Sequence, residues 1–359
     1  MPRNVHPVAA LALRARRLLQ RNQTVAEALA PFGPMGWCAG VMKEGREPMF
    51  FFGGEAVQGE RPVERDTIFR IASVSKMFGA AAALRLVRAG KLTLDGDISD
   101  VFGFRVTPAI TLRQLLTHTA SLRDGVYDAA LESGNLPPLN ELLPKSFAGY
   151  APGTRYSYSN LGAGVAGMLV EKASGMLFDD YVRSQFFLPY GVDASFHPQR
   201  IRDAQRLANC YEMPGGQLSY HAVAIAKEPL DEQPNPLRHY IVPAGKLMIS
   251  APNLLACVRR LWLEDRDMFV HQKGIGSVPG DSGRGLGCSM GIDAFGCTTW
   301  GHQGNAYGAI AQAWIAPERQ TYAVLLTNGV KQRSVGGFNL AGQSAICALL
   351  DTAEAAWGR

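Results

Sequence analysis

The chain has 359 residues, of which 47% are hydrophobic and 19% charged. This composition excludes a disordered chain, a coiled coil and a fibrous repeat, and at roughly 150 residues per domain the length corresponds to a little over two domains. The 36 Lys and Arg against 31 Asp and Glu give a net charge of +5. The only dense basic run is Arg14–Arg17, with Arg21 one turn further on. We interpret this run as the solvated face of a helix and expect no nucleic-acid partner.

Membrane and targeting signals are missing from the sequence. No segment reaches the roughly 18 apolar residues of a membrane span. A short apolar stretch, Val8–Leu13, is followed at once by arginines and not by a small-residue cleavage site, which argues against a signal peptide. The sequence therefore predicts a cytoplasmic protein, or one that lacks its export signal here. It leaves the oligomeric state open.

The six cysteines contain no C-x-x-C pair, and no Cys/His cluster has zinc spacing. We therefore expect no metal and no cofactor. Cys288 and Cys297 are placed to face each other across a hairpin, and the sequence leaves open whether they form a disulfide or remain free thiols.

Helical and strand patterns follow one another along the chain. The N-terminal part predicts a helix over 8–30, a hairpin of strands 36–42 and 48–53, and an apolar helix over 73–89 that ends at Gly90. The C-terminal part predicts a helix over 251–263, strands over 310–315 and 321–327, and a closing helix over 338–357.

Strands at both ends with helices between them predict an α+β protein. We expect residues 1–70 and 235–359 to form one discontinuous α/β lobe, and residues 71–234 to form a mainly helical lobe. A cleft between two such lobes is a natural place for a binding site.

The first candidate for chemistry is Ser73-x-x-Lys76, at the start of the apolar helix. A spacing of three places both side chains on one helix face. A serine hydroxyl needs an adjacent base to act as a nucleophile, and a lysine in an apolar setting has a lowered pKa. The amide of Ser73 has no partner within the helix, so it is available for an oxyanion.

Two further motifs carry polar groups. Tyr158-Ser159-Asn160 lies where a loop enters a helix, so Tyr158 is placed to transfer a proton and Asn160 to hold Lys76 and a substrate carbonyl. The plainer interpretation of this segment is a turn with Asn160 as the helix cap. His302-Gln303-Gly304 has a strand pattern, in which a glycine allows close approach of a ligand backbone.

Two other motifs are weaker. Lys43-Glu44-Gly45 has the K-x-G form, but it lies in a predicted hairpin turn. Gly287–Gly291 fits G-x-S-x-G, which in α/β-hydrolases places the serine between a strand and a helix. A short segment ending in glycine follows Ser289, which favours a hairpin and argues against Ser289 as a nucleophile.

With S-x-x-K, Y-x-N and H-x-G in this order, the sequence resembles the penicillin-recognising serine hydrolases, in the branch of class C β-lactamases, D-alanyl-D-alanine carboxypeptidases, D-amino-acid amidases and esterases. The resemblance covers most of the chain. It includes five further stretches: Thr67–Ala72, Gly90–Gly96, Leu115–Thr119, Pro152–Gly153 and Ala244–Met248.

The resemblance implies a β-lactamase/transpeptidase-like fold, in which an antiparallel sheet is flanked by the N- and C-terminal helices and a helical lobe is inserted. It implies that Ser73 is acylated, that Lys76 and Tyr158 relay protons, and that Asn160, His302 and Gly304 bind substrate. The amides of Ser73 and Asn305 would form the oxyanion hole. It also suggests that His118 is a structural residue on a helix.

The sequence departs from this pattern at two positions. The third motif has His302 where class C β-lactamases have lysine, and a neutral imidazole attracts a substrate carboxylate less than an ammonium does. This favours a carboxypeptidase-, amidase- or esterase-like hydrolase over a β-lactamase, with a non-catalytic binding protein of the same fold as the other alternative.

The second departure is Ser121, which replaces the usual glycine and puts the local turn in doubt. Arg284 is a candidate for a substrate carboxylate, but the sequence does not place it near the cleft.

Overall fold

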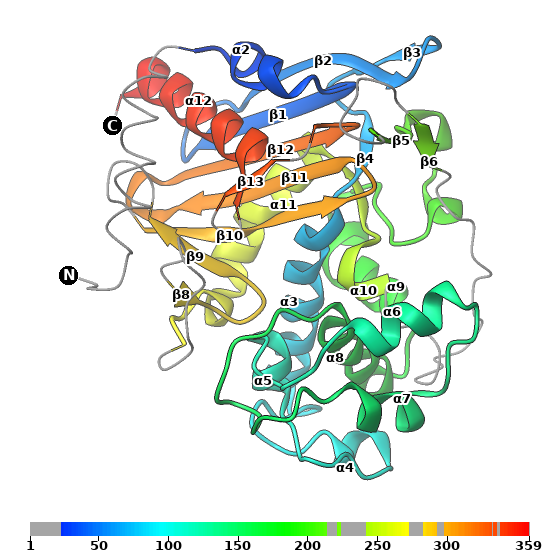
Figure 1. Cartoon of the computed structure of the whole chain (residues 1–359). Coiled ribbons are helices and arrows are strands. Elements are labelled where there is room, and N and C mark those ends of the chain that lie inside the picture. The colour runs from blue at the N-terminus through cyan, green and yellow to red at the C-terminus, as the bar shows by residue number, and fades with distance from the viewer. Residues whose placement is uncertain are drawn as a thin grey trace.

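The computed structural model describes residues 23–213, 221–223, 242–272, 283–292, 298–331, 333–335 and 338–358. Its central element is an eight-stranded sheet in the order β3-β2-β1-β12-β11-β10-β9-β8, with every pair antiparallel (Figure 1). The strands are β1 (Gly36–Lys43), β2 (Met49–Val57), β3 (Arg61–Pro62), β8 (Gly283–Arg284), β9 (Ser289–Ile292), β10 (Thr298–Ala306), β11 (Ala309–Ala316) and β12 (Thr321–Asn328).

Helices cover both faces of this sheet. Helix α12 (Leu340–Trp357) and the short α2 (Val25–Leu29) pack on one face, and α11 (Ala251–Glu264) packs on the other (Figure 1). Every residue of β11 and β12 is therefore buried. Alternate residues of β12 enter different core clusters, because successive side chains of a strand point to opposite faces.

Most predicted elements of the sheet layer are confirmed. The hairpin of β1 and β2, the strands β11 and β12, and helix α11 lie where the patterns place them. The two terminal helices differ from the prediction. Thr24 has an extended backbone and forms a capping box with Glu27, so α2 starts at Val25 instead of continuing a helix from residue 8; residues 8–22 lie outside the described part. Asn339 caps α12 through Gly342 N, so this helix starts at Leu340, two residues after the predicted start near Phe338, and ends at Trp357 as predicted.

The helices of the middle of the chain gather below the sheet in Figure 1, and α3 (Ser75–Arg88) runs from the sheet into them. Helix α3 packs against α8 (Asn160–Ser174). The other α-helices described here are α4 (Ser99–Phe102), α5 (Leu112–Leu116), α6 (Gly125–Glu132), α7 (Leu139–Ser146), α9 (Phe178–Val182) and α10 (Val242–Gly245). The lobe boundaries near residues 70 and 235 stay predictions.

Three small two-stranded sheets complete the described structure. They pair β4 (Ile68–Arg70) with β7 (Met248–Ser250), β5 (Cys210–Glu212) with β6 (His221–Val223), and β13 (Ser334–Val335) with β14 (Phe338–Asn339). The pair of β4 and β7 helps to position Ser73, because β4 leads directly into the turn that carries this residue.

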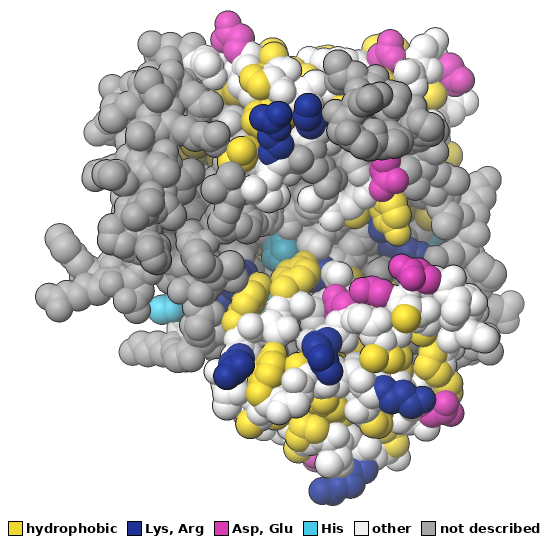
Figure 2. Space-filling model, in the orientation of Figure 1, with side chains coloured by type: hydrophobic (Ala, Val, Ile, Leu, Met, Phe, Trp, Pro, Cys, Tyr) yellow, Lys and Arg dark blue, Asp and Glu magenta, His cyan; other side chains and the backbone are white. Residues whose placement is uncertain are grey.

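Surface and composition features bear on several expectations. In the described part of the face drawn in Figure 2, Lys and Arg side chains are scattered among acidic and hydrophobic ones. Among the described residues no single helix has the length and hydropathy of a membrane span. Helix α8 and the segment Phe178–Tyr190 reach that length and hydropathy only when they are taken together, and the two are bent by 76° relative to each other.

The described residues contain no group of three or more His, Cys, Asp or Glu placed to hold a metal. The Cys288 thiol is buried 3.4 Å from Met268 O, whereas Cys297 lies outside the described residues, so their pairing stays a prediction.

Candidate active site

Ser73 lies in a 3₁₀ turn, η2 (Ala72–Val74), directly before α3. Ala72 has a φ of 44°, in the left-handed region that residues with a Cβ rarely adopt. Such a backbone costs on the order of 1–3 kcal/mol and persists only where the surroundings enforce it. Here Ala72 is fully packed, so the strained turn fixes the position of Ser73 at the start of the helix.

Lys76 is buried in the first turn of α3 and makes three hydrogen bonds. Its Nζ lies 3.0 Å from Ser73 Oγ, 2.9 Å from Asn160 Oδ1 and 2.6 Å from Ala244 O. Burial lowers the pKa of Lys76 to about 7, with the negative charge of Asp124 acting in the opposite direction. A substantial fraction of Lys76 is therefore neutral near pH 7 and able to accept a proton from Ser73.

Tyr158 reaches the same serine from the side of α8. Its hydroxyl lies near the Ser73 side chain, and its ring centroid lies 4.9 Å from Lys76 Nζ. The residue as a whole is 38% exposed, but its hydroxyl is desolvated, and this raises the pKa of Tyr158 well above its usual value although the Ser73 side chain acts in the opposite direction. The phenol is therefore protonated near neutral pH and is a proton donor rather than a base.

Asn160 is the first residue of α8 and not its cap. The cap is Ser159, whose hydroxyl accepts from Gly162 N at 2.9 Å. The interpretation of Asn160 as a helix cap is therefore wrong, and its side chain is left to accept a hydrogen bond from Lys76.

His302 and Gly304 lie on β10, as the strand pattern predicts. His302 is buried, and its Nδ1 lies 2.6 Å from Gln303 O. Burial and the nearby charge of Lys76 lower the pKa of His302 to about 3, with the bond to Gln303 opposing the shift. The imidazole is therefore neutral at pH 7, and its centroid lies 6.3 Å from that of Tyr158.

Gly304 brings β10 against the turn that carries Ser73. A Cβ at this position would lie 2.3 Å from Ile71 O and 3.1 Å from Ser73 N. Glycine is thus required for the strand to pack on the chain's own backbone, whereas the strand pattern suggested close approach of a ligand. The exposed Asn305 follows it on the strand, and the oxyanion hole of Ser73 and Asn305 amides stays a prediction.

The two weaker motifs lie in different settings. Ser289 starts β9, which pairs antiparallel with β10, so it is not at a strand-to-helix turn. The described strands contain no parallel pair in the main sheet that an α/β-hydrolase would need. Lys43 is the last residue of β1, at the opposite end of that strand from Gly36. Its Nζ donates to Gly358 O at 3.0 Å.

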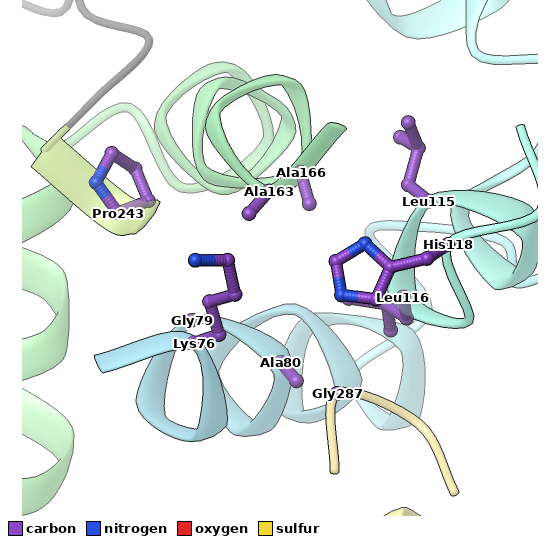
Figure 3. Close-up of a pocket in the computed structure, with 10 residues that line it drawn as sticks. All are labelled: Lys76, Gly79, Ala80, Leu115, Leu116, His118, Ala163, Ala166, Pro243 and Gly287. Atoms are coloured by element: carbon purple, nitrogen blue, oxygen red, sulfur yellow. The ribbon is translucent and has the colours of Figure 1, made fainter. Parts of the chain in front are cut away.

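His118 is not on a helix, contrary to expectation. It follows α5 with a φ of 56°, and its ring centroid lies 4.4 Å from that of Tyr158. Its Nδ1 accepts a hydrogen bond from Ser159 N at 3.2 Å. His118 and Lys76 project toward a common pocket between α3 and α8 (Figure 3). Burial and the charge of Lys76 hold the pKa of His118 well below its usual value.

Two further charged residues lie near this group. Arg284 on β8 is buried, with its Cζ 4.2 Å from the centre of the Tyr156 ring and Nη1 bonded to Ser289 Oγ. Its positive charge contributes to the low pKa values of His118 and His302. Asp124 binds the start of α8. Both residues come from loops or short strands, where no local sequence pattern indicates a shared site.

Ser121 has the left-handed backbone that a glycine at this position would adopt, with a φ of 60°. It is buried. The turn is therefore formed despite the substitution, at the cost of strain in a residue that carries a Cβ.

The fold and this group of side chains define a class of protein: an α+β chain in which a half-buried serine and a buried lysine lie between an antiparallel sheet and a helical half. The family model described as Beta-lactamase matches residues 16–341. The chain belongs to the beta-lactamase family, and the predicted family and fold are confirmed.

Individual relatives are distant. The chain is 25% identical over 296 residues to penicillin-binding protein 4 of Amycolatopsis lactamdurans, which covers 74% of each protein. It is 35% identical over 166 residues to esterase EstB of Burkholderia gladioli, which covers 39% of this chain and 42% of the esterase. Several curated relatives are matched over less than half of their own length.

The fold is also that of the D-amino acid amidase from Ochrobactrum anthropi SV3, whose structure was determined with L-phenylalanine amide. The two superpose with a TM-score of 0.71 at 20% identity, over 98% of this chain and 99% of the amidase.

Proposed function

We propose that this protein is a serine hydrolase that forms a covalent acyl-enzyme on Ser73, with an amide, ester or β-lactam carbonyl as its target. The observation that carries the proposal is the buried Lys76, whose Nζ lies 3.0 Å from Ser73 Oγ and whose pKa is lowered to about 7. A serine nucleophile requires an adjacent base, and a neutral amine at hydrogen-bond distance from its hydroxyl is one arrangement that supplies it.

In the proposed reaction, neutral Lys76 accepts the proton of Ser73 while Oγ attacks the substrate carbonyl. The tetrahedral oxyanion receives hydrogen bonds from the amides of Ser73 and Asn305. As the bond to the leaving group breaks, the Tyr158 phenol donates its proton to that group, and protonated Lys76 reprotonates Tyr158. Water then attacks the ester carbonyl with the same groups in reverse roles, which releases the acid and restores Ser73.

The other motif residues have binding roles in this proposal. Asn160 holds the Lys76 amine and contacts the substrate, which lies along the edge of β10 at His302 and Gly304. Because neutral His302 uses its one N–H, at Nδ1, to donate to Gln303 O, its Nε2 offers a substrate carboxylate neither an ion pair nor a hydrogen bond. This favours a carboxypeptidase-, amidase- or esterase-like activity over that of a class C-type β-lactamase, in line with the names of the amidase and esterase relatives.

The acyl-enzyme is tested by labelling with a fluorescent penicillin or a fluorophosphonate, followed by mass spectrometry of the peptides. We expect the adduct on Ser73, no labelling of Ser73→Ala, and unchanged labelling of Ser289→Ala. An adduct on Ser289 contradicts Ser73 as the nucleophile, and no adduct with either reagent contradicts the hydrolase and favours a binding protein. Parallel rates on a chromogenic cephalosporin, a D-Ala-D-Ala peptide, a D-amino-acid amide and a p-nitrophenyl ester then identify the substrate class.

A further inference from the structure

Asp124, which the sequence did not single out, makes three hydrogen bonds to the segment Ser159–Leu161, two of them within the Tyr158–Asn160 motif. Its Oδ1 accepts from Ser159 Oγ at 2.7 Å and from Leu161 N at 3.1 Å, and its Oδ2 accepts from Asn160 N at 2.7 Å. One carboxylate from the loop before α6 therefore binds three consecutive residues at the start of α8. It satisfies two amide groups that have no partner within the helix.

The bound segment is the one that meets Lys76. Asn160 accepts from Lys76 Nζ through its side chain while its own amide donates to Asp124, so a single residue links the carboxylate to the amine. Tyr158 precedes this residue by two positions, and its ring lies over Lys76 Nζ. A shift of the helix start would move both contacts to Lys76 together.

The charge of Asp124 acts on the same amine. The groups around Lys76 come from five elements: Ser73 of η2, Tyr158 and Asn160 at α8, His118 after α5, His302 on β10 and Ala244 of α10. His302 and His118 are neutral at pH 7, and Arg284 on β8 is cationic. Asp124 is the carboxylate, within the described residues, whose charge stabilises the protonated amine.

We propose that Asp124 is a positioning residue for the acyl transfer: its carboxylate binds the segment that carries Tyr158 and Asn160 and so holds these two side chains against Lys76. The inference rests on the proposed function. It assigns a role to a residue outside the three motifs, and Asp124 acts only through Lys76, Tyr158 and Asn160.

The test compares Asp124→Asn with Asp128→Asn. Asparagine keeps one oxygen acceptor but removes the charge, whereas Asp128 is an exposed carboxylate one turn into α6 with no hydrogen bond to the motif among those described. Loss of the Asp124 charge lowers the pKa of Lys76, so we expect the acidic limb of kcat/KM against pH to move to lower pH in Asp124→Asn. The limb of Asp128→Asn should stay at its wild-type position.

Removal of the whole side chain tests the positioning role. We expect Asp124→Ala to lose roughly a hundredfold in kcat/KM, the scale of a misplaced catalytic group, with most of the loss in kcat. Thermal unfolding shows whether Asp124→Ala folds. If it does not fold, the test depends on Asp124→Asn alone. If Asp124→Asn has both the acidic limb and the kcat/KM of the wild-type protein, the inference is wrong. Labelling of Ser73 in the wild-type protein tests the hydrolase separately, so the two failures are distinguishable.

Discussion

Lys76 illustrates how a single side chain gains its chemistry from burial. Met77, Phe78 and a run of glycine and alanine follow it in α3, and the side chain is buried with three hydrogen-bond partners. Loss of hydration disfavours the ammonium form, so the pKa falls to about 7. The amine is therefore able to exchange protons at the pH at which most hydrolases operate.

The low pKa of Lys76 predicts a pH dependence. Below about pH 7 the amine is protonated and cannot accept the proton of Ser73, so kcat/KM should fall roughly tenfold per pH unit, and above this value it should level off. Lys76→Arg stays protonated throughout and should lose at least about a hundredfold. A pH–rate profile checks both. An unchanged rate in the arginine variant would mean that another group is the base.

Ser121 supplies a prediction on stability. A left-handed backbone is strained for serine, and its buried hydroxyl oxygen has no hydrogen-bond partner in the described structure. Ser121→Gly removes the backbone strain and the buried hydroxyl. The gain in stability is partly offset, because glycine gives the unfolded chain more conformational freedom. We expect the free energy of unfolding to rise by about 1 kcal/mol, measured by urea denaturation. A decrease would show that the hydroxyl makes a stabilising contact.

At the scale of elements, the site depends on the packing of β10 against η2. The strand carries His302 and Gly304, and the turn carries Ser73, so in the proposed reaction the distance between them decides where substrate lies relative to Ser73. The contact is very close, because the missing Cβ of Gly304 leaves room for Ile71 O and Ser73 N.

Gly304→Ala should therefore separate the strand from the turn. We expect a loss of stability of about 1–3 kcal/mol from overpacking and a fall in kcat/KM of more than about tenfold. Gly53→Ala is the matched control, since Gly53 also lies in a strand and its Cβ would meet only the Trp37 side chain, at 3.4 Å. Thermal unfolding and labelling kinetics of the two variants check the prediction. Equal behaviour of both would contradict it.

Sequence patterns predicted the elements well where one physical signal dominated. Short β-branched and aromatic runs separated by glycines indicated the strands, and Pro252 after Ser250 indicated the start of α11. They failed where a cap competed with a hydrophobic pattern, as at Thr24. They also failed for His118, because a left-handed residue just after α5 has no signal of its own.

At the scale of the whole molecule, the sequence predicted the fold and the family because three motifs occur in order along most of the chain. It predicted Ser73, Lys76, Tyr158, Asn160 and His302 as candidates from their residue types and spacing. It did not predict Asp124 or the position of Arg284, since both reach the group through tertiary packing. Their roles depend on which loops the sheet and the helical half bring together.

The pairing of β1 with β12 has a consequence for how the protein is made. These neighbours in the middle of the sheet come from opposite ends of the chain, with Gly36 opposite Asn328. Such non-local pairing is slow, since a very long loop must close before the contacts form. β10, which lies against Ser73, joins the sheet through β11 and β12. A ribosome must therefore release the chain at least as far as β12 before β1 and β10 can be joined in one sheet beside Ser73.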